Sequence, residues 1–471
     1  MTSLPTSSSN RRHAVVMGAS MAGLLAGRIL LNHFERVTIV ERDRLGSSSE
    51  PRRGVPQGTH AHVLLTRGQQ ILEQLFPGFI ADLAAEGAPQ VNWTAECPMY
   101  SIKGWQPRFV SDVVTYTCSR SFLELKIRQR LQQFDRLQFV DQSSVSELIY
   151  NSSRREITGV KVRHLKTDET ETLQTQLVVD ATGRNSNAPK WLTQWGYEAP
   201  QETVINPFLG YSSRWYQQPS DLKVDWKALL IENLAPNQGR AGILYPVEGN
   251  RWIVSLSGLG RDYPPTDEAG FLEFARSLRH RIIYDVIKNA QPLSPIHPYH
   301  RTENRLYHYE KLTRLPQGLV MLGDAVCAFN PIYGQGMTTA ALGALTLNEC
   351  LQSQKQWTGL TQTFQKKLFK VIQNPWLMAA GEDIRWPTTE GGKTDWMTQL
   401  NQGYFNQMML IMKDNPDLYH TFNEVIHMLK PPTALFHPKY VFKVLASLLN
   451  NRSNLTESMP DSTIPQLSSP G

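Results

Sequence analysis

Residues 15–27 read VVMGASMAGLLAG, and this stretch constrains the fold more than any other part of the chain. The valine-rich run 13–18 predicts a buried parallel strand, and the small and leucine residues of 20–31 predict a helix. Residues 36–41, RVTIVE, predict a second strand. Strand, glycine turn, helix and strand together indicate a βαβ unit that binds a dinucleotide at the helix N-terminus, with a purely structural turn as the alternative.

The turn departs from the pattern G-x-G-x-x-G at its second glycine. Gly18 and Gly23 occupy the first and third positions, and Ser20 occupies the second. We expect Gly18 to form the tight turn and Gly23 to let the helix pack against the strand, while Ser20 is small enough to admit a pyrophosphate. Glu41 ends the second strand at the spacing expected of the carboxylate that accepts ribose hydroxyls.

Two later segments each place an acidic residue at the end of a predicted strand. Residues 177–179 lead into DATGRNS, which contains Asp180 and Gly183, and GLVMLGDAVCAFNPIYGQG leads past Asp324 to a helix that begins near Gly336. A carboxylate at the tip of a parallel strand is placed to bind a ligand hydroxyl. For Asp324, a helix or turn cap is the alternative.

In this order and spacing, GASMAG, DATGRNS and LGDAVCAFNPIYGQGMTTA resemble the FAD-binding motifs of the single-component FAD-dependent monooxygenase superfamily, which has the para-hydroxybenzoate hydroxylase-like fold. The resemblance covers most of residues 12–351. Residues 51–65 and 118–128 are most similar to the branch that contains polyether-pathway polyene epoxidases. Cys327 stands where hydroxylases often have histidine, which argues against an aromatic hydroxylase more than against FAD.

The resemblance implies FAD as cofactor and NAD(P)H and O₂ as co-substrates, with oxygen transfer through a C4a-hydroperoxyflavin. It implies that the glycine turn holds the diphosphate, that Arg120 reaches the diphosphate or the ribityl chain, that Asp324 binds a ribityl hydroxyl, and that residues 331–337 line the isoalloxazine. The expected cofactor-binding residues are Gly18, Ser20, Gly23, Glu41, Arg42, Arg120, Asp180, Gly183, Asp324, Pro331, Gly334, Gly336 and Met337.

We identify no essential catalytic side chain, because in such enzymes the cofactor supplies the chemistry and the protein positions the substrate. His60 and His62 are candidates for contact with the flavin, with a hydrogen-bonded loop histidine as the alternative, and Arg214 is a candidate anchor for a substrate carboxylate. The pair His60 and His62 lacks a third ligand at useful spacing, so we predict no metal. Arg52 and Arg53 either attract the phosphates of the nicotinamide cofactor or form a solvated pair.

The predicted fold class is α/β, with a Rossmann-like FAD-binding domain interleaved with a mainly antiparallel β-sheet substrate domain and followed by a helical region. The FAD-binding domain would comprise residues 13–80, 112–196 and 301–354, and the substrate domain residues 81–111 and 197–300. Residues 355–450 would form the C-terminal helical region, and residues 1–12 and 451–471 would be disordered tails.

The substrate domain is rich in aromatic residues, most of which we expect in its core. The remainder would line an apolar pocket for a hydrophobic metabolite such as a polyene, a terpenoid or a polyketide. The aromatic residues of the substrate domain, core and pocket together, include Trp93, Tyr100, Trp105, Phe109, Phe208, Tyr211, Trp215, Tyr216, Trp226, Tyr245 and Trp252.

Net charge, hydropathy and cysteine content narrow the possible binding partners and the cellular compartment. The net charge of +6 is scattered, which disfavours nucleic-acid binding, and no apolar run approaches the ~20 residues that cross a bilayer. The four dispersed cysteines indicate a reducing cytoplasm. Residues 436–450 are amphipathic and either pack on the body of the protein or make a peripheral membrane contact.

The leading hypothesis is an FAD-dependent monooxygenase that epoxidises or hydroxylates a hydrophobic metabolite. The alternatives are a flavin-dependent reductase of prenyl double bonds, similar to geranylgeranyl reductase, and a non-catalytic FAD-binding protein. A flavin-dependent halogenase is disfavoured because the W-x-W-x-I-P signature of those enzymes is absent from the sequence. NADH and NADPH stay open as alternatives.

Overall fold

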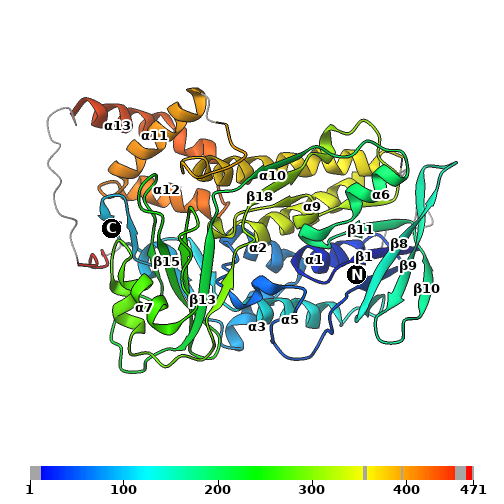
Figure 1. The fold of residues 1–471 in the computed structure, drawn as a ribbon, viewed down its shortest axis with the longest axis horizontal. Coiled ribbons are helices and arrows are strands. Elements are labelled where there is room, and N and C mark those ends of the chain that lie inside the picture. The colour runs from blue at the N-terminus through cyan, green and yellow to red at the C-terminus, as the bar shows by residue number, and fades with distance from the viewer. Residues whose placement is uncertain (1–11, 354–357, 394–395, 451–462, 469–471) are drawn as a thin grey trace.

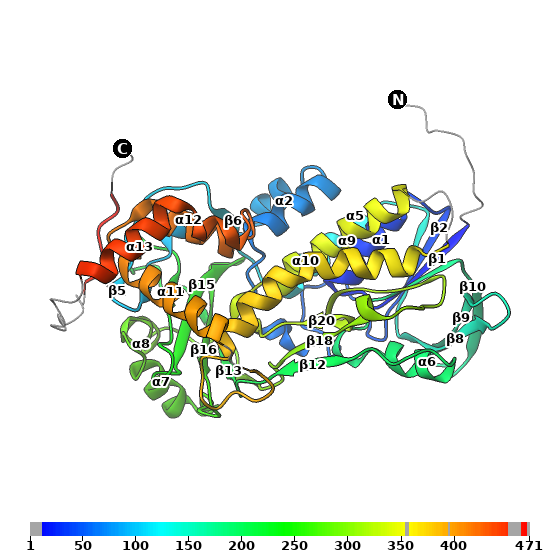
Figure 2. The same ribbon diagram turned by 90° about the horizontal axis from the view of Figure 1, so that it is seen from above.

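The computed structural model describes residues 12–353, 358–393, 396–450 and 463–468. The molecule is elongated, with a parallel sheet toward one end and an antiparallel sheet toward the other (Figure 1). Two long helices, α9 (Gly336–Ser353) and α10 (Leu360–Asp383), run beside each other over the parallel sheet (Figure 2). This mixture of sheets and helices confirms the predicted fold class.

Within the described residues the parallel sheet has five strands in the order β19-β11-β1-β2-β7. All neighbouring pairs are parallel, so the carboxyl ends of the strands meet at one edge, and β1 is buried along its whole length. Helix α1 packs against α5 and α9, and a buried apolar core fills the space between these helices and the sheet. The bounds are β1 (His13–Met17), α1 (Met21–Leu30), β2 (Arg36–Val40), α5 (Arg120–Leu131), β7 (Leu137–Val140), β11 (Leu177–Asp180) and β19 (Leu319–Met321).

The second large sheet has seven described strands in the order β17-β13-β16-β15-β14-β4-β5, and all its pairs are antiparallel except β14 with β4. Side chains alternate between its faces, so Leu244 and Val254 pack against helices α7 and α8 while Tyr245 and Ile253 face the opposite way. The bounds are β4 (Met99–Ser101), β5 (Gly104–Trp105), β13 (Gly210–Gln217), β14 (Leu229–Ile231), β15 (Ala241–Val247), β16 (Arg251–Gly258), α7 (Glu268–Arg276), α8 (Ile282–Ile287) and β17 (His297–Tyr299).

Smaller elements connect and flank the two sheets. A three-stranded antiparallel sheet, β10-β9-β8, projects at the end of the molecule beyond the parallel sheet (Figure 1). The bounds are α2 (Thr66–Leu75), α3 (Phe79–Ala85), β3 (Gln90–Asn92), α4 (Trp93–Glu96), β6 (Val114–Tyr116), β8 (Ser143–Asn151), β9 (Glu156–His164), β10 (Thr170–Gln174), α6 (Ala188–Gln194), β12 (Glu202–Ile205), β18 (Asn304–Tyr307) and β20 (Cys327–Ala328).

Helices α11 (Trp396–Met412), α12 (Pro416–Ile426) and α13 (Pro438–Asn450) pack together on the antiparallel-sheet side of the molecule. Their core includes Met408 and Met412, as expected for helix packing, together with Met99 of β4. None of the described helices combines the length and the apolarity needed to span a bilayer.

Residues 463–468 return to the body of the protein, and the prediction of disorder was wrong for this segment. Arg108 Nη1 donates to the carbonyl oxygen of Pro465, and the backbone amide of Ser468 donates to the carbonyl oxygen of Arg108. A polar, proline-rich composition favours disorder unless the segment finds partners, and here a buried arginine supplies them. The rest of the predicted C-terminal tail, and residues 1–11 of the N-terminal one, lie outside the described residues.

Two leucines of α10 give a matched test of this packing. Leu368 is buried against α9, whereas Leu377 on the same helix is 59% exposed. We expect Leu368→Ala to lower the free energy of unfolding by about 2–5 kcal/mol, because it leaves a cavity. The control Leu377→Ala should change it by less than about 0.5 kcal/mol. Urea unfolding followed by circular dichroism measures both, and similar losses would contradict the packing.

Candidate active site

At the turn between β1 and α1, segments of backbone lie so close together that no side chain fits between them. Gly18 has a φ of +99°, and a Cβ atom there would lie 2.6 Å from the carbonyl oxygen of Ala181. A Cβ atom on Gly23 would lie 1.8 Å from the carbonyl oxygen of Gly18. Both positions therefore require glycine, and the N-terminus of α1 opens at the carboxyl edge of the parallel sheet.

Ser20, the departure from the glycine pattern, belongs to a buried polar network. Its backbone is extended, with φ −97°, so the conformation does not require glycine. The Ser20 hydroxyl donates to Glu124 Oε1 at 2.6 Å and accepts a hydrogen bond from Arg120 Nη2 at 2.8 Å. Burial alone would raise the pKa of Glu124, but Arg120 and Arg52 outweigh it and lower this pKa to about 2.

Arg52 connects this network to Glu41. Its Nη2 donates to Glu124 Oε2 at 2.5 Å, and its Nη1 lies 3.3 Å from Glu41 Oε2. The same Glu41 oxygen accepts the backbone amide of Ala19 at 2.7 Å, so the carboxylate is fixed beside the turn. The side chain of Arg52 is only 9% exposed, which excludes a solvated pair, whereas Arg53 is exposed.

The two acidic residues at the strand ends have different surroundings. Asp180 is fully buried, and its carboxylate accepts hydrogen bonds from Thr182 and from the Ser186 hydroxyl. Asp180 therefore holds the shape of the loop that contains Gly183, and its direct contact with the cofactor stays a prediction. Asp324 is half-buried and has no hydrogen-bond partner among the described residues.

Asp324 is the carboxylate that this edge of the sheet leaves available to a ligand hydroxyl. Burial raises its pKa, while the nearby cations Arg184 and Arg120 lower it. Arg184 in turn donates to Glu303 Oε1 at 2.9 Å and to the carbonyl oxygen of Phe329 at 3.2 Å, which ties two of the loops together. Arg184 lies within DATGRNS, but its long-range partners gave no signal in the sequence.

The segment from Pro331 to Met337 leads into α9. Gly334 has a φ of +65°, and no atom lies within 4 Å of a Cβ atom built on Gly336, so the space before this helix start is open. The side chain of Met337 is buried in the core of the parallel sheet. A ligand at this place would therefore meet backbone rather than the Met337 side chain.

The C-terminal helical region fixes this segment through Asp383, which sequence reasoning did not identify. The Asp383 carboxylate is fully buried at the end of α10. It accepts hydrogen bonds from Asn304 Nδ2 at 2.6 Å, from Asn330 Nδ2 at 3.0 Å and from the Tyr333 hydroxyl at 2.8 Å. Burial raises the pKa of Asp383 to about 7, against these hydrogen bonds, which lower it. No local pattern around GED predicts such distant partners.

His60 and His62 lie between the two large sheets as neutral side chains. His60 is buried, bonds the Ser213 hydroxyl through Nδ1 at 2.8 Å, and has a pKa that burial lowers to about 3. Its ring centre lies 4.7 Å from Tyr211 and 5.7 Å from Tyr299. Burial lowers the pKa of His62 to about 4, with a contribution from Arg120, so His62 lies near the charged network.

Two other predicted residues lie apart from this arrangement. Arg214 Nε donates to the carbonyl oxygen of Ser294, and Nη1 lies 3.2 Å from Glu268 Oε1, so its guanidinium is bound within the substrate sheet. Its role as a substrate anchor stays a prediction. Arg42 is exposed directly after Glu41, and its contact with the cofactor also stays a prediction.

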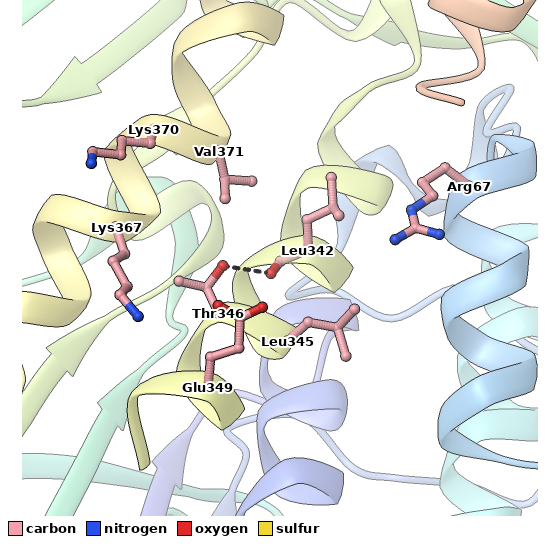
Figure 3. Close-up of a pocket in the computed structure, with 8 residues that line it drawn as sticks. All are labelled: Arg67, Leu342, Leu345, Thr346, Glu349, Lys367, Lys370 and Val371. Atoms are coloured by element: carbon pink, nitrogen blue, oxygen red, sulfur yellow. Dashed lines mark hydrogen bonds between the residues drawn. The ribbon is translucent and has the colours of Figure 1, made fainter. Parts of the chain in front are cut away.

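Two other features with the composition or shape of a ligand site lie away from the predicted cofactor-binding residues. Asp112, His420 and Glu424 come close enough to hold a metal ion, but Lys430 forms an ion pair with Glu424, so we assign no metal there. A cavity of about 270 Å³ lies between α2, α9 and α10 (Figure 3), and it includes none of the predicted site residues. Its lining residues are Arg67, Leu342, Leu345, Thr346, Glu349, Lys367, Lys370 and Val371.

The arrangement fits FAD by three observations on the protein itself. The turn at Gly18 and Gly23 exposes backbone at a helix N-terminus, Asp324 offers an unpartnered carboxylate, and the space before Gly336 is open. The Glu41 carboxylate still has lone pairs for ribose hydroxyls, although Ala19 and Arg52 occupy others. The fold and the site together match what is expected of an FAD-dependent oxidoreductase of the single-component monooxygenase superfamily.

Comparisons with known proteins agree with this class. No family model matches the chain. The protein Rv3254 of Mycobacterium tuberculosis is 31% identical over 382 residues, which cover 79% of this chain and 80% of the relative. Kynurenine 3-monooxygenase of Salinispora arenicola is 24% identical over 361 residues, 72% of either chain. The chain belongs to the same family as Rv3254.

Solved structures share the fold at low sequence identity. The flavin-dependent brominase Bmp2 superposes with a TM-score of 0.65 and 13% identity, over 94% of this chain and all of that one. A flavoprotein/dehydrogenase from Cytophaga hutchinsonii gives a TM-score of 0.62 and 14% identity, over 94% of this chain and all of its own. These solved structures confirm the predicted fold, and their names agree with the predicted superfamily and its FAD cofactor, whereas the epoxidase branch stays a prediction.

Asp383 generates a test with a pH dependence. Its pKa is about 7 in the folded protein against 3.8 ordinarily, so the folded state binds this proton more tightly and loses stability as pH rises from about 4 to 7. Asp383→Asn removes that dependence and the hydrogen bonds that hold Tyr333. We expect the variant to be destabilised more at pH 5 than at pH 8, and to bind FAD more weakly at both.

Urea unfolding at the two pH values and flavin fluorescence titrations measure these effects. Asp417→Asn is the matched control, because the Asp417 side chain is 78% exposed at the start of α12. The control should show neither effect. A loss of stability in Asp383→Asn that is the same at both pH values would contradict the assignment.

Proposed function

We propose that the chain is a monooxygenase that uses NAD(P)H and O₂ to epoxidise or hydroxylate a hydrophobic metabolite, such as a polyene, a terpenoid or a polyketide. One observation supports this proposal most: neutral, aromatic side chains stand opposite the flavin-facing loops. His60, Tyr211 and Tyr299 have ring centres within 4.7–5.7 Å of one another, and burial raises the pKa of Tyr299, with smaller contributions from the charges of Arg184 and Asp324.

The residues of the chain have distinct tasks in this proposal. The network of Ser20, Arg120 and Glu124 would orient the diphosphate side of the cofactor, and Asp324 would hold a ribityl hydroxyl. Bound FAD would accept reducing equivalents from NAD(P)H and activate O₂. The His60, Tyr211 and Tyr299 cluster would exclude water and contact the substrate through apolar surface, since both histidines stay neutral near pH 7.

The names of two relatives favour oxygen transfer, but they do not identify the substrate of this chain. These relatives, from Salinispora arenicola and Salinispora tropica, are kynurenine 3-monooxygenases at 24% and 25% identity. In our proposal the substrate is larger and less polar, because the described surroundings of His60 are aromatic and Arg214 is already paired. The reductase of prenyl double bonds and the non-catalytic FAD-binding protein remain the alternative functions.

The test is NAD(P)H oxidation by the FAD-loaded protein with and without candidate polyenes and terpenoids, under ¹⁸O₂. We expect substrate to stimulate oxidation and one labelled oxygen to enter an epoxide or an alcohol. A reduced and unlabelled product would replace the monooxygenase with the reductase. A halogenated product in the presence of bromide or chloride would overturn the oxygen-transfer proposal.

We also propose that the protein works in the cytoplasm with a peripheral membrane contact through residues 436–450. Two features of α13 support this: Phe442 and Leu445 are exposed, and Lys439 and Lys443 lie beside them. Hydrophobic metabolites partition into membranes, so such a contact would bring the enzyme to its substrate.

A further inference from the structure

Exposed apolar side chains gather on the C-terminal helices, well beyond residues 436–450. We call this surface the C-terminal face and define it by the exposed members of α11, α13 and the 3₁₀ turn Pro432–Phe436. Helices α11 and α13 are in contact and lie at the same end of the molecule in both views (Figures 1 and 2). The members are Trp396, Met397, Leu400, Phe436, Phe442, Leu445, Leu448 and Leu449.

The exposure is not a sign of a loosely placed helix, because the opposite side of α13 is well packed. Tyr440 and Val444 are buried with Met408 and Met412 of α11. Across the same contact, the ring of Phe436 stacks on Tyr404 at a centre-to-centre distance of 4.8 Å. These contacts fix which face of α13 points outward.

The outward side chains follow helical spacing. Phe442, Leu445 and Leu449 stand three and four residues apart on α13, and two of them are three-quarters exposed. Trp396, exposed by 70%, and Leu400 stand four residues apart at the start of α11. On α13 this spacing places large apolar side chains along one side of the helix, which indicates a binding face rather than chance exposure.

The charged residues around the C-terminal face indicate which kind of partner it binds. Helix α11 and the 3₁₀ turn contain no charged residue, and α13 contains Lys439 and Lys443 but no acidic residue. Lys443 Nζ donates to Asn415 Oδ1 at 2.6 Å, and Lys439 Nζ lies 3.9 Å from Asp417, so both ammonium groups sit at the rim. A second copy of this face would bring cations together, whereas anionic lipid headgroups would pair with them.

We propose that the C-terminal face binds the surface of an anionic membrane, with α11 and α13 lying in the headgroup region and their apolar side chains reaching the acyl chains. The use of this contact, to collect a lipid-soluble substrate, rests on the proposed function. The binding itself extends the membrane contact proposed above for residues 436–450 and does not depend on oxygen transfer.

The face is connected to the flavin-facing segment through the end of α10. Gln402 Nε2 of α11 donates to the carbonyl oxygen of Gly381 at 3.2 Å. Two residues further along the chain, Asp383 holds Asn330 and Tyr333. The membrane-binding helix and the segment before α9 therefore share one structural support.

The test is co-sedimentation of the FAD-loaded full chain with vesicles of phosphatidylcholine, with or without phosphatidylglycerol. We expect binding to the anionic vesicles and much weaker binding to phosphatidylcholine alone. Phe442→Asp with Leu445→Asp should weaken it more than about tenfold, through lost apolar burial. Lys439→Gln with Lys443→Gln should weaken binding to the anionic vesicles alone, roughly fivefold for each lysine.

Leu165→Asp is the matched control, because Leu165 is 49% exposed on the turn between β9 and β10 at the other end of the molecule. It should bind like the wild type, and all variants should keep their unfolding midpoints. Equal binding by the Phe442→Asp, Leu445→Asp variant would overturn the proposal. So would a lipid-free dimer that this variant dissociates, because the face would then join two copies.

Vesicle binding and dimer formation are both measured without turnover. Failure of vesicle binding can therefore be told apart from failure of the proposed oxygen transfer.

Discussion

The close approach of α1 to the ends of β1 and β11 is the constraint on which the site depends. Gly18 and Gly23 let the backbone of the turn pass within contact distance of the loop after β11, and any side chain there would push the layers apart. Because the strands are parallel, the loops after β1, β11 and β19 then meet at one edge of the sheet. The helix N-terminus, the Asp180 loop and Asp324 are neighbours for that reason alone.

The buried ions beside the turn show how the protein accommodates a serine in place of the second glycine. Arg120 and Arg52 both pair with Glu124, and Ser20 bridges Arg120 and Glu124, so removing Glu124 would leave two buried arginines without this partner. Glu124 is paired with two arginines, and Arg52 is also paired with Glu41, so the buried charges beside the helix N-terminus balance one another. The N-terminus of α1, with its partial positive charge, is the feature that suits a diphosphate.

Much of the fold and of the candidate site could be predicted from the sequence, because the strands, the glycine turn and Asp324 each depend on a short segment of the chain. The valine runs of β1 and β11 give strands, the glycines give the turn, and Asp324 stands at the end of its strand. What could not be predicted depends on contacts between distant segments. Asp383 reaches Asn304 and Tyr333, and Arg52 reaches Glu124, across stretches that carry no periodic signal.

The same distinction explains two contacts that composition and position in the sequence did not indicate. Asp180 has the sequence position of a ligand-binding carboxylate, but Thr182 and Ser186 lie close enough along the chain to take up its oxygens. The segment 463–468 has the composition of a disordered tail, but it finds the buried guanidinium of Arg108. In both cases a specific hydrogen-bond partner decided the outcome, and composition could not reveal it.

The account claims that the β1–α1 turn recognises the diphosphate and adenosine of a dinucleotide, so the most direct measurement compares FAD with FMN. Both flavins would be titrated into the apoprotein, with binding followed by quenching of flavin fluorescence. The account predicts that FAD binds at least about a hundredfold more tightly, since it alone offers the diphosphate bridge and the adenosine ribose that several charge-assisted hydrogen bonds can hold. Equal affinities would contradict it, because the turn and Glu41 would then contribute nothing to recognition.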